Sequence, residues 1–196
     1  MRIISGKFKG RRILPPKNLP VRPTTDMSKE ALFNVLGNHF DFTGLKILDL
    51  FAGTGNISFE FASRGSDNIT SVDEDFGCIK FITQIAEGFD FGIAPTKSDV
   101  FKYLERNKKN TYDIIFADPP YAMSQENFEK VVLTIFEKEL LNEDGMMVIE
   151  HSKYTKLDHL INFSFKKVYG GSIFSFFEID KNSETENEIL DFEDEG

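Results

Sequence analysis

Four residues in the middle of the chain, Asp118-Pro119-Pro120-Tyr121, combine a carboxylate, two prolines and an aromatic ring. They directly follow residues 112–117, a short apolar run rich in aromatic and β-branched side chains that predicts a buried strand. Two consecutive prolines prevent the strand from continuing and a helix from starting at once. The Asp118 carboxylate and nearby backbone carbonyls could therefore hold an exocyclic amine while Tyr121 stacks on its planar base. The alternative is a rigid turn that carries Asp and Tyr without a chemical role.

A second motif is an apolar strand over residues 46–50 that runs into a turn containing Gly53 and Gly55. These glycines would let the backbone approach a ligand closely and would expose the amides at the start of the next helix. A dinucleotide site uses a similar turn. However, the third glycine of that fingerprint is Ser58 here, and the Asp49 carboxylate would repel a pyrophosphate. Asp49 suits the cationic methionine portion of S-adenosylmethionine, so we expect a sulfonium cofactor.

The order of the motifs resembles that of class I S-adenosylmethionine-dependent methyltransferases acting on amine nitrogens. The amino-terminal segments are more specific, namely residues 2–13, 21–26 and 29–36. With them, residues 1–180 resemble the bacterial family of small-subunit ribosomal RNA guanine-N2 methyltransferases. This resemblance implies methyl transfer to N2 of a guanine in 16S rRNA (guanine 966 in the usual ribosomal numbering) during small-subunit assembly. The choice of guanine rests on the resemblance, because the tetrapeptide would serve adenine-N6 or cytosine-N4 equally well.

The resemblance also implies a set of site residues around one crevice beyond the carboxyl ends of the strands. Asp73, which follows Gly53 by 20 residues (73 − 53), would bind the ribose hydroxyls; it could instead cap the next helix. The family more often has Glu at this position, and Glu74 could take its place. Asp99 and the Val100 amide would bind the adenine, while Asp99 could also cap a helix. The expected cofactor-binding residues are Asp49, Phe51, Gly53, Gly55, Asp73, Asp99, Val100 and Asp118. The expected catalytic residues are Asp118, Pro119, Pro120 and Tyr121.

The net charge of −9 is divided unevenly along the 196 residues. Residues 1–29 contain eight Lys and Arg against one Asp, a sum of +7, whereas residues 184–196 contain seven acids and no base, a sum of −7. Such asymmetry indicates a polyanionic partner for the basic end, although a lysine-protected edge hairpin is the alternative. The expected RNA-binding residues are Arg2, Lys7, Lys9, Arg11, Arg12 and Arg22. The acidic tail could compete with RNA for this end.

Composition narrows the remaining choices. The chain is long enough for one α/β domain, and no apolar run approaches the ~20 residues of a membrane span. Cys78 is the single cysteine, so no internal disulfide can form and a reducing cytoplasm is expected. His39, His151 and His159 lack metal-ligand spacing, and methyl transfer to an amine needs no metal. We expect a monomer that acts on 16S rRNA or an assembling 30S subunit.

The elements that must position these residues alternate between strands and helices. Strands are expected at 46–50, 69–72, 92–97, 113–117 and 145–150, and helices at 26–40, 56–64, 75–89, 99–107 and 125–140. Two alternating runs, 163–169 and 172–179, are joined by Gly170-Gly171 and predict a terminal antiparallel hairpin. The predicted fold is a Rossmann-like class I methyltransferase with a mostly parallel seven-stranded sheet and a small basic β-hairpin at the amino terminus. The expected divisions are 1–24 (basic hairpin and proline-rich linker), 25–180 (methyltransferase domain) and 181–196 (disordered acidic tail).

Two other functions remain open. One is methylation of another planar amine, either DNA adenine-N6 or protein glutamine-N5. A DNA enzyme would normally need a separate recognition domain, and the glutamine enzymes usually have Asn in place of Asp118. The other is a catalytically silent RNA-binding module on the same fold, which the acids at Asp49, Asp73, Asp99 and Asp118 disfavour.

Overall fold

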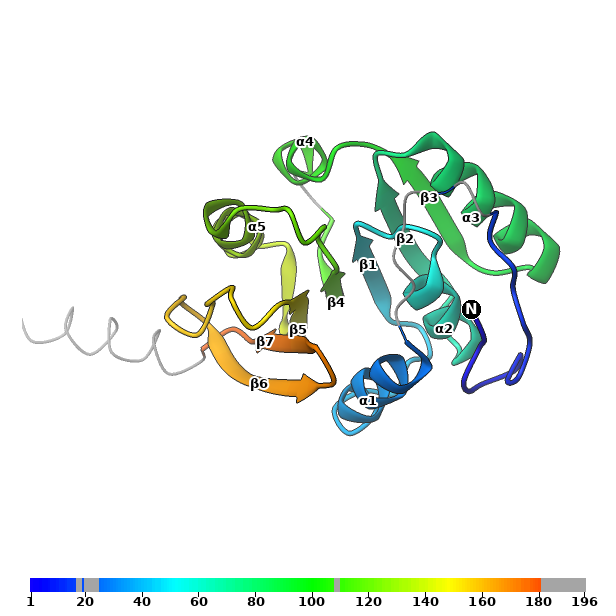
Figure 1. Cartoon of the computed structure of the whole chain (residues 1–196), viewed down its shortest axis with the longest axis horizontal. Helices are drawn as coiled ribbons and strands as arrows, with labels where there is room; N and C mark the ends of the chain where they lie inside the picture. The colour runs from blue at the N-terminus through cyan, green and yellow to red at the C-terminus, as the bar shows by residue number, and fades with distance from the viewer. Residues whose placement is uncertain (17–18, 20–24, 108–109, 181–196) are drawn as a thin grey trace, which may run out of the picture.

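The computed structural model describes residues 1–16, 19, 25–107 and 110–180, and its centre is one seven-stranded sheet (Figure 1). The strand order is β3-β2-β1-β4-β5-β7-β6. The strands are β1 (Lys46–Leu50), β2 (Asn68–Asp73), β3 (Ile93–Lys97), β4 (Tyr112–Ala117), β5 (Leu141–His151), β6 (Phe163–Tyr169) and β7 (Ser172–Phe177). β1 to β5 pair in parallel, and β7 pairs antiparallel with both β5 and β6. The predicted parallel sheet with a terminal hairpin is therefore confirmed.

Helices cover both faces of this sheet (Figure 1). They are α1 (Asp26–Leu36), α2 (Asn56–Ser63), α3 (Phe76–Phe89), α4 (Val100–Arg106) and α5 (Gln125–Glu137). Alternate residues of a strand point to opposite faces, so Ile47 of β1 packs in the cluster with α1 and α2, whereas Leu48 packs in the cluster with α4 and α5. Likewise in β4, Ile114 packs in the cluster with α1 and α2, and Ile115 packs in the cluster with α4 and α5. The two apolar cores fix the strand ends that carry the site.

Many element bounds differ from the sequence predictions by one to three residues, and two bounds differ by four. α1 ends at Leu36 instead of residue 40, because the Asn38 and His39 amides donate only three residues back, to Val35 and Leu36, and form turns. β5 begins at Leu141 instead of residue 145, because a register shift between Tyr112 and Ile114 lets the strand pair again beyond Gly145. Neither change moves a carboxyl end of a strand.

The amino-terminal segment, residues 1–13, turns back on itself but is not a regular β-hairpin. Its antiparallel pairing is one isolated bridge between Arg2 and Arg12, with turns between them. Ile3 and Ile13 are buried in a cluster with Phe59 of α2 and residues of α3. Packing against these helices replaces the strand ladder that the alternating pattern predicted.

Several sequence predictions lie outside the described residues. These are the prolines at 20 and 23, the basic residue Arg22 and the acidic tail over 181–196. Within the described ranges, no helix is both long enough and apolar enough to cross a membrane. The same ranges contain no group of three or more His, Cys, Asp or Glu that could hold a metal ion.

Candidate active site

A cleft of about 700 Å³ lies where β1, β2, β3 and β4 end. Most of the residues predicted for cofactor binding and catalysis line it. They are Asp49, Phe51, Gly53, Asp73, Asp99, Val100, Asp118, Pro119, Pro120 and Tyr121. Parallel strands place their carboxyl ends at one edge, which is why residues far apart in the sequence meet here. Its volume lies in the range usual for small-molecule sites.

The glycine turn after β1 shapes one wall of the cleft. The Gly53 amide donates to Oδ2 of Asp73 over 2.8 Å, which joins the ends of β1 and β2. Gly55 does not line the cleft; it precedes α2 with a left-handed φ of 76°. A Cβ there would lie 2.9 Å from the Ile82 side chain, so backbone conformation and packing both require glycine. The N-cap residue Gly55 has no side chain that could cap α2, and the Asp49 carboxylate instead accepts from the Ser58 amide in the first turn. Asn56 at the start of α2 lines the cleft.

Asp49 is buried in the cleft wall and is held by α2. Its Oδ2 accepts hydrogen bonds from both the amide (3.1 Å) and the hydroxyl of Ser58, and that hydroxyl lies 2.6 Å from Ser71 Oγ. Burial outweighs these hydrogen bonds and raises the pKa of Asp49 to about 7. Comparison with the dinucleotide fingerprint showed only that position 58 is serine where that fingerprint has glycine. The role of Ser58 as the partner of Asp49 follows from its place one turn into α2.

Asp73 organises the backbone at the end of β2. Its Oδ1 accepts from the Asp75 amide over 2.8 Å, while Oδ2 accepts from Gly53. The residue that caps α3 is Asp75, which accepts from the Cys78 amide, so the alternative role of Asp73 as helix cap is wrong. Glu74 also lines the cleft. Binding of a ribose by Asp73 stays a prediction.

Asp99 and Val100 follow β3, the neighbour of β2, and line the cleft on the side of Asp73. Asp99 caps α4 by accepting from the Lys102 amide over 3.0 Å, so the capping role proposed from sequence is confirmed. Val100 is buried, and Phe101 beside it also lines the cleft. The cap fixes the Asp99 carboxylate at the helix start; its contact with an adenine stays a prediction.

The tetrapeptide after β4 forms the opposite lip. The Asp118 amide donates to the Leu50 carbonyl over 3.3 Å, which continues the pairing of β4 with β1. Pro119 is buried, whereas Tyr121 is 52 % exposed. The Pro120 carbonyl accepts from the Met123 amide over 2.9 Å in a local turn. The Pro120 carbonyl is therefore occupied by a turn hydrogen bond and not by a neighbouring strand.

Further residues line the cleft that were not predicted as site residues, although several of them lie within or next to the sequence motifs. They are Thr25, Ser28, Ala52, Thr54, Asn56, Ile57, Asp75, Cys78, Phe101, Phe116, Met123, Glu150 and Ser172. Cys78 is buried, and desolvation followed by the charges of Asp73 and Asp75 raises the pKa of its thiol to about 12. It is therefore a neutral thiol at physiological pH.

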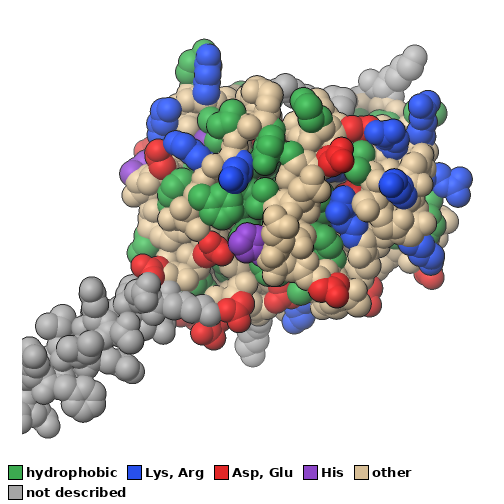
Figure 2. All heavy atoms as spheres, turned by 90° about the horizontal axis from the view of Figure 1, so that it is seen from below, with side chains coloured by type: hydrophobic (Ala, Val, Ile, Leu, Met, Phe, Trp, Pro, Cys, Tyr) green, Lys and Arg blue, Asp and Glu red, His purple; other side chains and the backbone are tan. Residues whose placement is uncertain are grey.

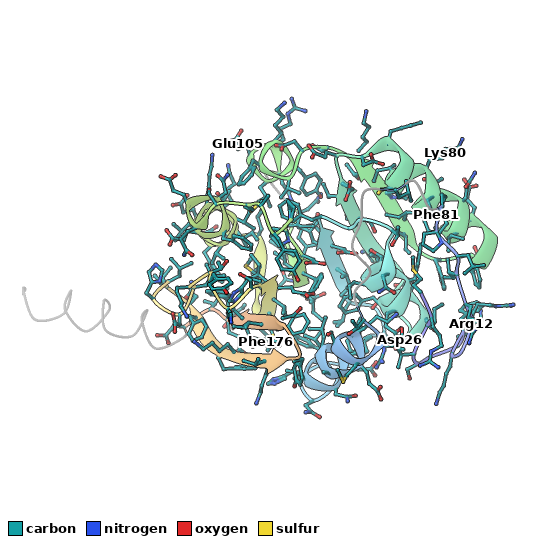
Figure 3. All side chains as sticks on the ribbon, viewed as in Figure 1. Arg12, Asp26, Lys80, Phe81, Glu105 and Phe176 are labelled. Carbon is teal, nitrogen blue, oxygen red and sulfur yellow. The ribbon has the colours of Figure 1, made fainter. Side chains whose placement is uncertain are left out.

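The basic amino-terminal segment lies to one side of the cleft. Lys7, Lys9, Arg11 and Arg12 are exposed, and Figure 2 shows Lys and Arg side chains gathered at the end of the molecule that carries this segment. Arg12 extends away from the body of the protein (Figure 3). Arg2 is paired with Asp26 at 3.0 Å, so part of its charge is already neutralised.

Comparisons with known proteins identify a family and relatives of this chain. Residues 1–178 match the model of a family described as conserved hypothetical protein 95. The chain is 32 % identical over 177 residues to Bacillus subtilis YlbH, named provisionally as an rRNA methyltransferase, with 87 % of this chain and 94 % of that protein covered. It is 31 % identical to the ribosomal RNA small subunit methyltransferase D of Buchnera aphidicola (strain APS) over 77 % and 78 % of the two chains.

Solved structures show the same fold. The Escherichia coli protein yhhF, described provisionally as a methyltransferase, superposes with a TM-score of 0.79 at 24 % identity and covers 92 % of this chain and 99 % of its own. A Thermus thermophilus 16S rRNA N2 G1207 methyltransferase, solved with AdoMet and guanosine, superposes with a TM-score of 0.67 at 18 % identity over 83 % and 45 % of the chains. These identities are low, so the likeness concerns the fold: a Rossmann-like class I methyltransferase.

Proposed function

The chain belongs to the family described as conserved hypothetical protein 95, and on that premise we propose that it transfers a methyl group from S-adenosylmethionine to N2 of a guanine in 16S rRNA. Relatives named as ribosomal RNA small subunit methyltransferases support rRNA as the substrate. Guanine 966 is the proposed position. The observation that carries the proposal is the cleft in which Asp73, Asp99 and the Asp118–Tyr121 loop meet.

The residues of the cleft fit S-adenosylmethionine. The glycine turn and the first residues of α2 offer backbone amides, and the acids Asp73 and Asp99 offer acceptors for ribose and adenine donors. Asp49, buried behind the turn, supplies a negative charge as it loses its proton. When bound, the cofactor supplies an electrophilic methyl group on a sulfonium. The protein must therefore align the acceptor rather than generate a strong nucleophile, and alignment of this kind can contribute ~7–11 kcal/mol of barrier reduction.

Asp118 and Pro119 are the proposed acceptor-holding groups. Asp118 is tied to the end of β1 through its own amide, so its carboxylate stands where β1 and β4 end side by side. The carboxylate and the Pro119 carbonyl would accept the two hydrogens of the guanine amine and orient the nitrogen lone pair. Asp118 would take the released proton after positive charge has developed on the nitrogen. Burial of Pro119 keeps this loop rigid.

Tyr121 is the proposed stacking partner of the base. It lines the cleft and remains half exposed, so a base turned out of the RNA could cover its ring. The exposed cations of the amino-terminal segment would hold the phosphates of the surrounding RNA.

The test is a transfer assay with labelled S-adenosylmethionine and four acceptors: 30S subunits, naked 16S rRNA, duplex DNA and a glutamine-containing protein. Label should enter the rRNA, in the particle or in the naked form. Transfer to DNA or protein instead would select the corresponding alternative, and no transfer to any acceptor would favour a silent RNA-binding module.

A further inference from the structure

A second exposed tyrosine stands at the same edge of the sheet as the proposed catalytic loop. Tyr154 lies in the segment between β5 and β6 and is 81 % exposed, more than Tyr121 at 52 %. Lys153 Nζ lies 5.2 Å from the centre of its ring. A single exposed aromatic residue needs no explanation. Tyr154 differs from a single exposed aromatic residue in three ways: its position near the cleft, the hydrogen bonds that hold its loop, and the positive charge beside its ring.

The position follows from strand pairing. β4 and β5 are parallel neighbours, with Ala117 paired to Ile149 near their carboxyl ends. The loops that follow them therefore leave the sheet at the same edge. Glu150, next in β5, lines the same cleft as Asp118 and Tyr121, so the cleft extends to the strand that leads into Tyr154.

The support comes from Gln125, the first residue of α5. Its side chain accepts from the Lys156 amide over 3.0 Å and donates to the Lys156 carbonyl over 2.5 Å. This pair of bonds fixes the 152–156 loop to the helix that begins just after the Tyr121 loop, and Figure 1 shows the segment beside α5. Ser152 supports the loop from within, because its hydroxyl and carbonyl accept from the amides of Tyr154 and Thr155. Tyr154 is thus an exposed ring on a backbone that is tied to the first residue of α5.

The charge near the ring is positive. Lys153 and Lys156 are exposed, and no ion pair involves either of them in the part of the chain that the structure describes. Neighbouring acids have partners: Asp158 binds Lys166 at 2.9 Å, and Glu129 accepts from Gln125 and lies 3.4 Å from His159. An aromatic ring with Lys153 beside it, and with Lys156 two residues after Tyr154 in the same loop, suits a base with its phosphate.

We propose that Tyr154 and Lys153 form a second RNA-binding site that stacks on an unpaired nucleotide neighbouring the target guanine, with Gln125 as the residue that positions it. This inference rests on the proposed function of the cleft. Two exposed aromatic rings at the same edge of the sheet would hold two splayed bases of one strand, the target on Tyr121 and a flanking base on Tyr154. Base–aromatic stacking tolerates any base, so the site would contribute affinity and register without reading sequence.

The experiment measures kcat and KM for naked 16S rRNA, affinity for a short single-stranded RNA with one guanine, and S-adenosylmethionine affinity. Tyr154→Ala should raise the KM for rRNA about 5- to 150-fold, the effect of losing one stacked base, with kcat and cofactor affinity unchanged. Tyr154→Phe should restore the wild-type KM. Gln125→Ala should raise KM in the same direction while kcat is retained, a split that general destabilisation would not give. Val168→Ala, at a 63 % exposed residue of β6, is the control and should change nothing.

The outcomes separate the two proposals. If Tyr154→Ala leaves KM and short-RNA affinity at the wild-type values while Asp118→Ala is inactive, the second site is wrong and the proposed function stands. If Tyr154→Phe is as impaired as Tyr154→Ala, stacking is not what the residue contributes and the inference falls. Should the wild-type protein transfer no methyl group to rRNA, both proposals fall together.

Discussion

At the scale of single residues, the acids could be found from sequence but their partners could not. Asp49 and Asp118 stand at strand ends, which an apolar run followed by glycine or proline marks clearly, and Asp73 is found by its offset of 20 residues (73 − 53) from Gly53. That Ser58 binds Asp49, or that Asp73 binds Gly53 instead of capping α3, depends on how α2 and α3 pack on the sheet. Short-range patterns carry no information on that packing.

Asp118→Ala should abolish methyl transfer while S-adenosylmethionine affinity falls only slightly, because the carboxylate is proposed to face the acceptor amine. Single-turnover transfer and calorimetry on the same preparation measure the two effects. Tyr121→Ala should weaken rRNA binding or turnover by ~1–3 kcal/mol of lost stacking, and Tyr121→Phe should be nearly neutral. Turnover of Asp118→Ala within a few-fold of wild type would remove the carboxylate from the mechanism.

Gly53→Val should prevent S-adenosylmethionine binding, because a branched side chain would occupy the turn that lines the cleft and strain a residue with a φ of 53°. Asp73→Ala should raise the cofactor dissociation constant through loss of the proposed ribose acceptor. Calorimetry measures both, with Gly88→Val as a control at a glycine whose added Cβ would meet open space. Unchanged affinity in both site variants would place the cofactor elsewhere.

Asp49 should make stability depend on pH. Its folded pKa of about 7 lies above the ordinary 3.8, so the folded state binds the proton more tightly than the unfolded state does. The stabilising contribution is complete below pH 3.8 and is lost as pH rises towards about 7. Asp49→Asn replaces the ionisable carboxyl group with a neutral amide, so this pH dependence disappears in the variant. The free energy of unfolding of the variant relative to wild type should therefore rise by about 2–4 kcal/mol from pH 4 to pH 7.5. A difference that stays constant with pH, followed by denaturant unfolding, would contradict the raised pKa.

At the scale of elements, alternation of strands and helices predicted the sheet and its terminal hairpin well. The structure of the amino-terminal segment could not be predicted in this way. Ile3, Phe8 and Ile13 alternate with cations and glycines, which predicts a hairpin, yet no local rule shows that α2 offers it a docking site. There the Glu60 carboxylate accepts from the amides of Ile4 and Ser5. The Gly6 backbone lies so close to the Ser63 carbonyl that no side chain would fit.

The role of Lys29 could not be predicted from local sequence patterns either. By composition it belongs to the basic end of the chain, but it is fully buried and paired with Glu60 at 3.3 Å. Its ammonium also donates to the Arg2 carbonyl and to Asn56 Oδ1, a residue of the cleft wall. Lys29 therefore joins the amino-terminal segment to the start of α2 and is not available to RNA phosphates.

Glu60→Ala should lower the free energy of unfolding by about 3–5 kcal/mol, because it leaves the buried Lys29 ammonium and two backbone amides without their carboxylate. Hydrogen exchange at Ile4 and Ser5 should also become faster. The control is Glu105→Ala, an exposed acid on α4 (Figure 3), which should change stability by less than about 0.5 kcal/mol. Equal stability of the two variants would show that the buried pair does not hold the segment.

At the scale of the whole molecule, the proposed methyl transfer and the proposed RNA binding belong to two regions, the cleft and the basic amino-terminal segment. The net charge of −9 does not exclude an RNA substrate, because the exposed cations of residues 1–13 gather at one end (Figure 2). Deleting this segment would uncover Phe59 and Phe81, which pack on Ile3 and Ile13, so truncation would confuse RNA binding with folding. Charge reversal avoids that problem. Competition by the acidic residues 184–196, which lie outside the described ranges, stays a prediction.

Arg11→Glu/Arg12→Glu should greatly weaken binding of 16S rRNA and leave S-adenosylmethionine affinity unchanged. The slope of log K against log salt should become shallower by about 1 for each phosphate that the protein no longer neutralises. Filter binding over a range of salt concentrations measures the slope. The control is Arg106→Glu/Lys138→Glu, which reverses the same number of charges on exposed residues of α4 and the end of α5. An equal weakening in both double variants would mean that net charge, and not the amino-terminal segment, governs binding.

Deleting residues 184–196, with their charge of −7, should tighten RNA binding at low salt and change little at high salt, since screening over ~8–10 Å removes a weak intramolecular competitor. Affinities measured with and without the tail at low ionic strength decide the point. Identical values would show that the tail serves another purpose, such as keeping the protein dispersed.

The most direct test of the proposed activity is to identify the methylated atom. 16S rRNA is incubated with S-adenosylmethionine and either the wild-type protein or Asp118→Ala, then digested to nucleosides and, in parallel, to fragments for mass spectrometry. We predict N2-methylguanosine in the fragment containing guanine 966 with the wild-type protein and none with the variant. A methyl group on adenine or cytosine, or equal methylation by Asp118→Ala, would contradict the proposed activity.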